Sequence, residues 1–224
     1  HFTRQKSMIC YGGMEIILFL LILLFSVVIH EVSHGAVANS LGDPTAKMSG
    51  RLTLNPLPRI DPIGSILVPA LLLFASGGQA AFGWAKPVPY NPYNLSNQKW
   101  GEALVAGAGP AVNILIAFIF AMVIRFGMAG GLLSPAFIEI ASFVVLINIL
   151  LAFFNLIPIP PLDGSKVLAA FLPAHLSQRF MSFQELMFRF GLIGGFLFIF
   201  IFLIFIWPIF SRLIFFIFSL LTGL

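Results

Sequence analysis

Three long apolar runs constrain what this chain can fold into. The first, from Ile16 to Ile29, has no charged residue, and the runs from Leu104 to Phe126 and from Ala136 to Ile157 have one each. A helix crosses a hydrocarbon core about 30 Å thick with about 20 such residues. Only 9% of the residues are charged, against about a quarter in soluble domains. The sequence therefore predicts an all-α polytopic membrane protein.

The first helix is expected from about Glu15 to Ser40, with Gly42 as its stop. From Thr45 to Ile60, short alternating stretches predict short β-strands at the membrane surface. The stretch from Ile63 to Ala75 is apolar but short, so it is either a brief span or a re-entrant or interfacial segment. The last run, Leu192 to Leu224, is too long for one untilted span, and one span with an interfacial tail and two short helices both remain open.

Composition also limits domain organisation and partners. Residues 1–13 differ in composition from the rest of the chain, and we interpret them as a tag remnant or a disordered leader. Residues 14–224 are expected to form a single membrane domain, with motifs in 14–166 and C-terminal membrane helices in 187–224. The net charge of +4 is too diffuse for a nucleic-acid surface. We therefore expect the chain to bind no nucleic acid and to have the lipid bilayer as its partner. A single cysteine excludes an internal disulfide, and nothing predicts an oligomeric state.

An H-E-x-x-H pattern lies near the end of the first apolar helix, with His30, Glu31 and His34. Residues four apart share a helix face, so the two imidazoles can bind one metal ion with the carboxylate beside it. Metallopeptidase zinc sites are built in this way. Such side chains are costly at membrane depth and mark a candidate functional site. The alternative is a chance match in which the two histidines are neutral and hydrogen-bonded.

The positions of Lys and Arg indicate how the chain is threaded. If residues 63–75 do not fully cross, most of the Lys and Arg lie on one face, which the positive-inside rule makes cytoplasmic. Arg125, near the other face, is the exception. The same threading brings Asp163 to the face near the two histidines. A catalytic zinc takes three protein ligands and a water, and Asp163 is the best candidate for the third. Among the other acids, Asp43 and Asp61 are expected in surface loops, Glu102 precedes a span, and Glu139 falls near the other face. The alternative is that Asp163 caps a short helix starting at Ser165.

Three motifs in this order resemble those of the site-2 protease family of intramembrane zinc metalloproteases. They are the H-E-x-x-H pattern, an A-G-P-x-x-N segment from Ala108 to Asn113, and an N-x-x-P-x-P-x-x-D-G pattern from Asn155 to Gly164. The resemblance covers about Met14 to Lys166. The loop from Phe82 to Asn94 is similar to the G-W-A-K-P-V-P stretch of the small subtype, and no PDZ or CBS module is found.

The resemblance implies a three-helix catalytic core with one Zn²⁺ per chain near the cytosolic side of a bacterial or archaeal cell membrane. It implies His30, His34 and Asp163 as ligands and Glu31 as the catalytic acid/base. The implied reaction is hydrolysis of a peptide bond within or next to a transmembrane helix of a protein or peptide substrate, in regulated intramembrane proteolysis.

Two asparagines are candidates for binding substrate or stabilising the oxyanion. Asn155 is the first, with an interhelical hydrogen bond as its alternative role. Asn113 is the second, and for it a structural role is favoured. Extended stretches at 52–54 and 85–89 are candidates for pairing with unwound substrate, with an ordinary interfacial loop as the alternative.

Two rival functions come from other classes. One is a non-proteolytic zinc-binding membrane scaffold or chaperone, against which the intact Glu31 argues. The other is a transporter, which inverted repeats and paired broken helices would indicate. We find neither feature in the sequence.

Overall fold

The computed structural model describes residues 13–57, 86–173, 175–180, 182 and 205–224. The leader at 1–12, the segment from Ile63 to Ala75 and the first part of the C-terminal run lie outside these ranges. The predictions made for them therefore stay predictions.

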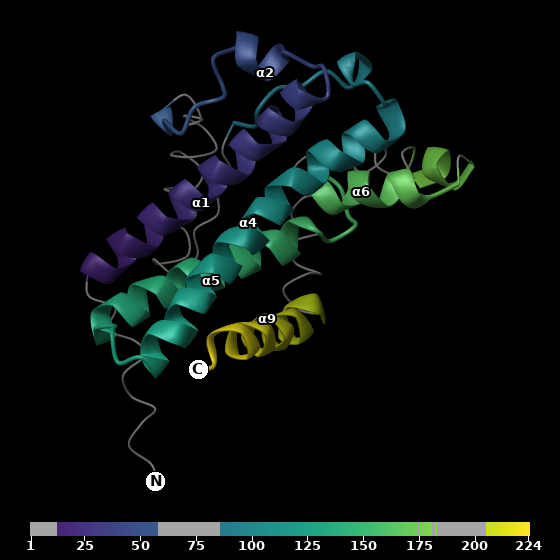
Figure 1. Ribbon diagram of the computed structural model, residues 1–224. Helices are drawn as coiled ribbons and strands as arrows, with labels where there is room; N and C mark the ends of the chain where they lie inside the picture. Colours follow the sequence, from purple (N-terminus) through teal and green to yellow (C-terminus); the bar gives the residue numbers. More distant parts are fainter. Residues whose placement is uncertain (1–12, 58–85, 174, 181, 183–204) are drawn as a thin grey trace.

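Three long helices form the body of the described structure. They are α1 (Gly13–Ser40), α4 (Gln98–Ala129) and α5 (Pro135–Asn155). Within the described residues, these three are long and apolar enough to cross a membrane. α4 packs along both α1 and α5, and Figure 1 shows the three lying side by side. The prediction of an all-α polytopic membrane protein is confirmed.

Local capping sets the helix ends. The Asn97 side chain accepts a hydrogen bond from the backbone N–H of Trp100 at 3.1 Å, and Ser134 accepts one from Phe137 at 3.3 Å. These residues are the N-caps of α4 and α5, and such bonds satisfy N–H groups that have no partner within the helix. After α1, Gly42 adopts a φ of +103°, which side chains other than glycine rarely tolerate. The chain therefore leaves α1 where Gly42 predicts.

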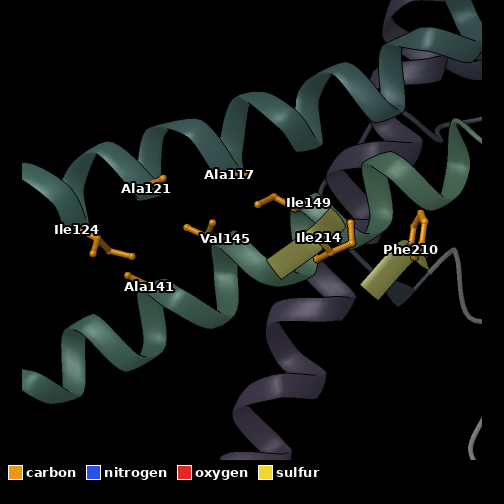
Figure 2. Close-up of a cluster of buried hydrophobic side chains, with 8 residues drawn as sticks. All are labelled: Ala117, Ala121, Ile124, Ala141, Val145, Ile149, Phe210 and Ile214. Carbon is orange, nitrogen blue, oxygen red and sulfur yellow. The ribbon is translucent and has the colours of Figure 1, made fainter. Parts of the chain in front are cut away.

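A hydrophobic core joins α4 and α5 to the C-terminal helix α9 (Trp207–Thr222). Figure 2 shows its buried side chains, with those of α4 and α5 facing one another: Ala117, Ala121 and Ile124 from α4, Ala141, Val145 and Ile149 from α5, and Phe210 and Ile214 from α9. The small alanines let the α4 and α5 backbones approach closely, as is usual in membrane bundles. α9 has only 16 residues, fewer than the roughly 20 of a full span.

The surface segment after α1 differs from the prediction of short strands. Thr45–Met48 forms the helical turn α2, and the described residues beyond it, up to Leu57, contain no strand. The carboxylate of Asp43 accepts hydrogen bonds from the backbone N–H and the hydroxyl of Thr45, which favours a helical turn there. The expected strands are wrong for this stretch because its backbone groups bond locally, as Arg51 N–H does to Ala46 O at 2.9 Å.

The end of α1 and the start of α4 lie at the same end of the bundle. The backbone N–H of Ser96 donates to the carbonyl of Leu41 at 2.9 Å, just after α1 and just before α4. α4 and α5 are joined at the opposite end by the short turn at 130–134. α5 therefore runs back toward the end of α1, and the short helix α6 (Asp163–Phe171), which packs on α4, begins close to that end.

Candidate metal centre

The structure brings His30, His34 and Asp163 together, and we call these three residues the histidine–aspartate cluster. The Asp163 Oδ2 atom lies 3.1 Å from His30 Nε2 and 3.3 Å from His34 Nε2. One donor atom from each residue lies within 4.8 Å of the other two. The two imidazole rings meet edge to face, with centroids 4.7 Å apart. If the H-E-x-x-H pattern were a chance match, nothing would require an acidic side chain from α6 to lie within 4.8 Å of both histidine rings.

A close backbone contact positions Asp163. A Cβ atom at Gly164 would overlap the carbonyl oxygens of Leu156 and Ile157, so the turn after α5 packs directly on this glycine. α6 begins at Asp163 itself, with Leu162 as its N-cap, and no side-chain hydrogen bond caps it. The Asp163 carboxylate is thus directed to the histidines, and the structure does not support the alternative of a cap for a helix starting at Ser165.

The donor set fits a zinc ion. His34 Nδ1 lies 2.6 Å from the backbone carbonyl of Val105, and since a carbonyl only accepts, Nδ1 carries the proton of the neutral ring. His34 Nε2 is then a lone-pair donor that faces the Asp163 carboxylate, and two such atoms repel unless a cation or proton lies between them. Ligand atoms of a tetrahedral zinc are about 3.4 Å apart, close to the separations of 3.1 and 3.3 Å.

Glu31 lies beside the cluster and is held by a different segment. Its Oε2 atom accepts a hydrogen bond from the backbone N–H of Val88 at 3.1 Å. Val88 belongs to the stretch at 86–90, which has no regular secondary structure, and is itself buried. The expected pairing of residues 85–89 with a substrate strand would require this N–H to be free. It is instead bonded to Glu31.

Gly109 is the feature of the site that the sequence did not single out. A Cβ atom there would lie 2.5 Å from His30 Cε1 and Nε2 and 2.6 Å from His34 Nε2. At Gly107, two residues earlier, a Cβ atom would meet nothing within 4 Å. The A-G-P-x-x-N segment from Ala108 to Asn113 includes Gly109, but the sequence does not show that this glycine, and not Gly107, faces the histidines.

The two candidate asparagines make no hydrogen bond to the cluster or to Glu31 in the described part of the chain. The Asn155 Nδ2 atom donates to Leu151 O in its own helix at 2.9 Å. Asn113 is completely buried in α4, and neither atom of its amide has a partner among the described residues. Their roles toward substrate stay predictions.

Comparisons with known proteins identify the family of this chain. The family model for peptidase family M50 matches residues 18–131 and 124–201. The chain belongs to this family, which is the site-2 protease family. No solved structure gives a significant match.

Three similar proteins are each named as a "Putative zinc metalloprotease". The chain is 37% identical over 156 residues to "Putative zinc metalloprotease YwhC" of Bacillus subtilis, covering 67% of each protein. It is 33% identical over 144 residues to Rip2 of Mycolicibacterium smegmatis, covering 63% of this chain and 52% of that protein. It is 44% identical over 64 residues to MJ0611 of Methanocaldococcus jannaschii, covering 29% of this chain and 31% of that protein. The designation of these relatives and the donor set of the cluster both indicate zinc as the metal.

Proposed function

We propose that this chain is a zinc metalloendopeptidase that hydrolyses a peptide bond within or next to a transmembrane helix of a membrane protein, in regulated intramembrane proteolysis. The observation that carries the proposal is that Asp163 meets the two histidines beside Glu31, and that both histidines and Glu31 lie on a helix of membrane-spanning length. Membership of peptidase family M50 supports the same class of activity.

In this proposal the cluster binds one zinc ion and Glu31 acts as the general base and then the general acid. Zinc bound by two imidazoles and a carboxylate supplies a Lewis acid that lowers the pKa of water toward about 7 and polarises a carbonyl. Glu31 takes a proton from the attacking water and passes it to the leaving amine. The N–H of Val88 orients this carboxylate through Oε2, so the base is positioned before substrate arrives.

Asn155 is proposed to donate a hydrogen bond to the oxyanion or to the substrate backbone. Its amide nitrogen is bonded to Leu151 O at 2.9 Å, so this role requires the side chain to rotate. Asn155 ends α5 and its side chain is only partly buried.

We further propose that the site faces the cytoplasm of a bacterial or archaeal cell. The segments at the cluster end of the bundle carry Lys47, Arg51, Lys86 and Lys166, whereas the turn at 130–134 carries no Lys or Arg. By the positive-inside rule, the end of the bundle that holds the cluster is then the cytoplasmic one. The three relatives named above come from two bacteria and Methanocaldococcus jannaschii.

The test is cleavage of a model single-span protein by the purified full chain in detergent, with product ends mapped by mass spectrometry. Glu31→Gln is expected to lower the rate by a factor on the order of 10²–10⁴ and to retain zinc, because Glu31 is outside the cluster. Glu102→Gln in α4 is the matched control and is expected to keep the wild-type rate. Zinc-loaded wild type that leaves single-span substrates intact would favour the scaffold alternative.

A further inference from the structure

Four buried side-chain atoms have no hydrogen-bond partner among the described residues. They are His30 Nδ1, both amide atoms of Asn113, and Asn148 Oδ1. They come from α1, α4 and α5, the three helices of spanning length. Buried polar atoms are nearly always paired, and the hydrocarbon core offers them no partner from bulk water. Their concentration in one part of the bundle therefore points to a ligand with hydrogen-bonding capacity.

Helix geometry places these atoms at neighbouring depths. Ser26 precedes His30 by four residues on α1, and Asn113 follows Gly109 by four residues on α4. Since Gly109 abuts the histidine rings and the two helices run in opposite directions, both residues lie one turn, about 5.4 Å, from the cluster toward the other membrane face.

Asn148 joins the same level from α5. Its Nδ2 atom donates to Ser26 Oγ at 2.9 Å, and this bond is buried. Ser26 is 5% exposed, and Asn113 and Asn148 are each 0% exposed. We call these three residues the interhelical polar layer.

The two histidines differ in how their second ring nitrogen is satisfied. His34 Nδ1 is paired with the carbonyl of Val105 at 2.6 Å, whereas His30 Nδ1 has no described partner. A metal-binding histidine almost always donates its other N–H to an oxygen, which fixes the tautomer and the ring orientation. His30 therefore needs an acceptor on the side of the ring away from the cluster.

We propose that the interhelical polar layer binds ordered water that accepts the hydrogen bond from His30 Nδ1, with Asn113 holding that water in place. The layer is neutral and offers both donors and acceptors, which suits water, since a buried water typically makes about three hydrogen bonds. Asn113 is then a positioning residue that acts on His30 through water. The inference rests on the proposed role of His30 as a zinc ligand.

The experiment measures zinc affinity of the purified full chain by competition with a chromogenic chelator, so proteolysis is not needed as a readout. Asn113→Leu keeps the side-chain size but removes both polar atoms, and it is expected to weaken zinc binding by about 10–100-fold. Asn113→Ser restores a hydroxyl with room for another water and should bind within a few-fold of wild type. Thr222→Val, a buried polar-to-apolar change whose hydroxyl bonds Phe218 O in α9, is the matched control and should bind as wild type does.

Equal zinc affinity of wild type and Asn113→Leu overturns the inference. If Asn113→Leu does not fold, an experimental structure of the wild type at a resolution that shows ordered water decides, because absence of density bonded to His30 Nδ1 also overturns it. Wild type that binds zinc but does not cleave refutes the proposed protease while the affinity comparison still holds. Wild type that binds no zinc overturns both.

Discussion

Gly109 in α4 packs directly against the imidazole of His30 in α1. A Cβ atom at this glycine would lie within 2.5 Å of the ring atoms Cε1 and Nε2, closer than real Cβ atoms come to their neighbours. The absence of a side chain at one position of α4 therefore allows the ring to reach Asp163. Helix packing and metal-site geometry are coupled at this contact.

Gly109→Ala is expected to displace both histidine rings and to weaken zinc binding by on the order of tenfold or more. Gly107→Ala is the control on the same helix, because a Cβ atom there meets nothing within 4 Å and alanine favours helix by about 1 kcal/mol over glycine. Zinc content of the two purified variants, measured by inductively coupled plasma mass spectrometry, checks the prediction. Equal zinc content would show that the contact can relax.

Gly164→Ala is expected to shift the start of α6 and to move Asp163 away from the histidines. The atoms that a Cβ would meet are the backbone carbonyls of Leu156 and Ile157, which cannot rotate aside as a flexible side chain could. Thermal unfolding with and without zinc measures the effect, since a ligand that binds the folded state at 100 times its Kd stabilises it by about 2.7 kcal/mol. The variant should lose most of this zinc-dependent shift, whereas Ser165→Ala should retain it.

Asp43 fastens the end of α1 to the loop that precedes α4. Its carboxylate accepts hydrogen bonds from the backbone N–H of Asn91 at 2.7 Å and from Asn94 Nδ2 at 2.9 Å, besides those from Thr45. Asp43→Asn replaces an acceptor by a donor facing donors, and it should lower the free energy of unfolding by about 1–3 kcal/mol. Thermal melting in detergent measures this, with Glu139→Gln at an exposed site of α5 as the control that should melt as wild type does.

The same residue predicts a pH dependence. Burial raises the pKa of Asp43, but the hydrogen bonds from Thr45, Asn94 and Asn91 outweigh burial and lower this pKa below its ordinary value of 3.8. The stabilisation is therefore complete above the ordinary value and is lost as the pH falls through the lower pKa of the folded state. The melting-temperature difference between wild type and Asp43→Asn should shrink in strong acid, and a difference that stays constant there would contradict this assignment.

Arg125 binds the end of α9. Its Nη1 atom donates to the carbonyl of Leu220 at 2.7 Å and to that of Leu221 at 3.4 Å, which satisfies carbonyls without a helical partner. Arg125→Met should weaken the last turn of α9 by about 1 kcal/mol. The backbone amides of that turn should then exchange hydrogen about fivefold faster than in wild type. Arg212→Met, at an exposed position of α9 itself, is the control, and exchange equal to wild type in Arg125→Met would refute the capping role.

Much of the described fold could be predicted because it depends on properties that run along the chain. Charge-free length predicts α1, α4 and α5, and Gly42 marks the end of α1. The approach of Asp163 to the histidines could also be predicted, since the threading of the three spans brings α5 back to the end of α1. These inferences need only helix length and direction.

Features that depend on a partner from elsewhere in the chain could not be predicted in the same way. The sequence predicts Asp43 in a surface loop, but this residue is fully buried because Asn91 and Asn94 close over it. Its bonds to Thr45 also produce a helical turn where the sequence predicts strands. The rotation of α4 likewise decides that Gly109, and not Gly107, faces the histidines.

The separation of His30 and Asp163 by 133 positions has a consequence for biosynthesis. A ribosome makes the chain from the N-terminus, so α1 carries its two imidazoles into the bilayer while the codons for α5 and α6 are still to be read. The three-atom cluster cannot exist until the end of α5 and the first residue of α6 have been made and packed. The nascent chain therefore gains a complete metal-binding group only after all three helices of spanning length have been made.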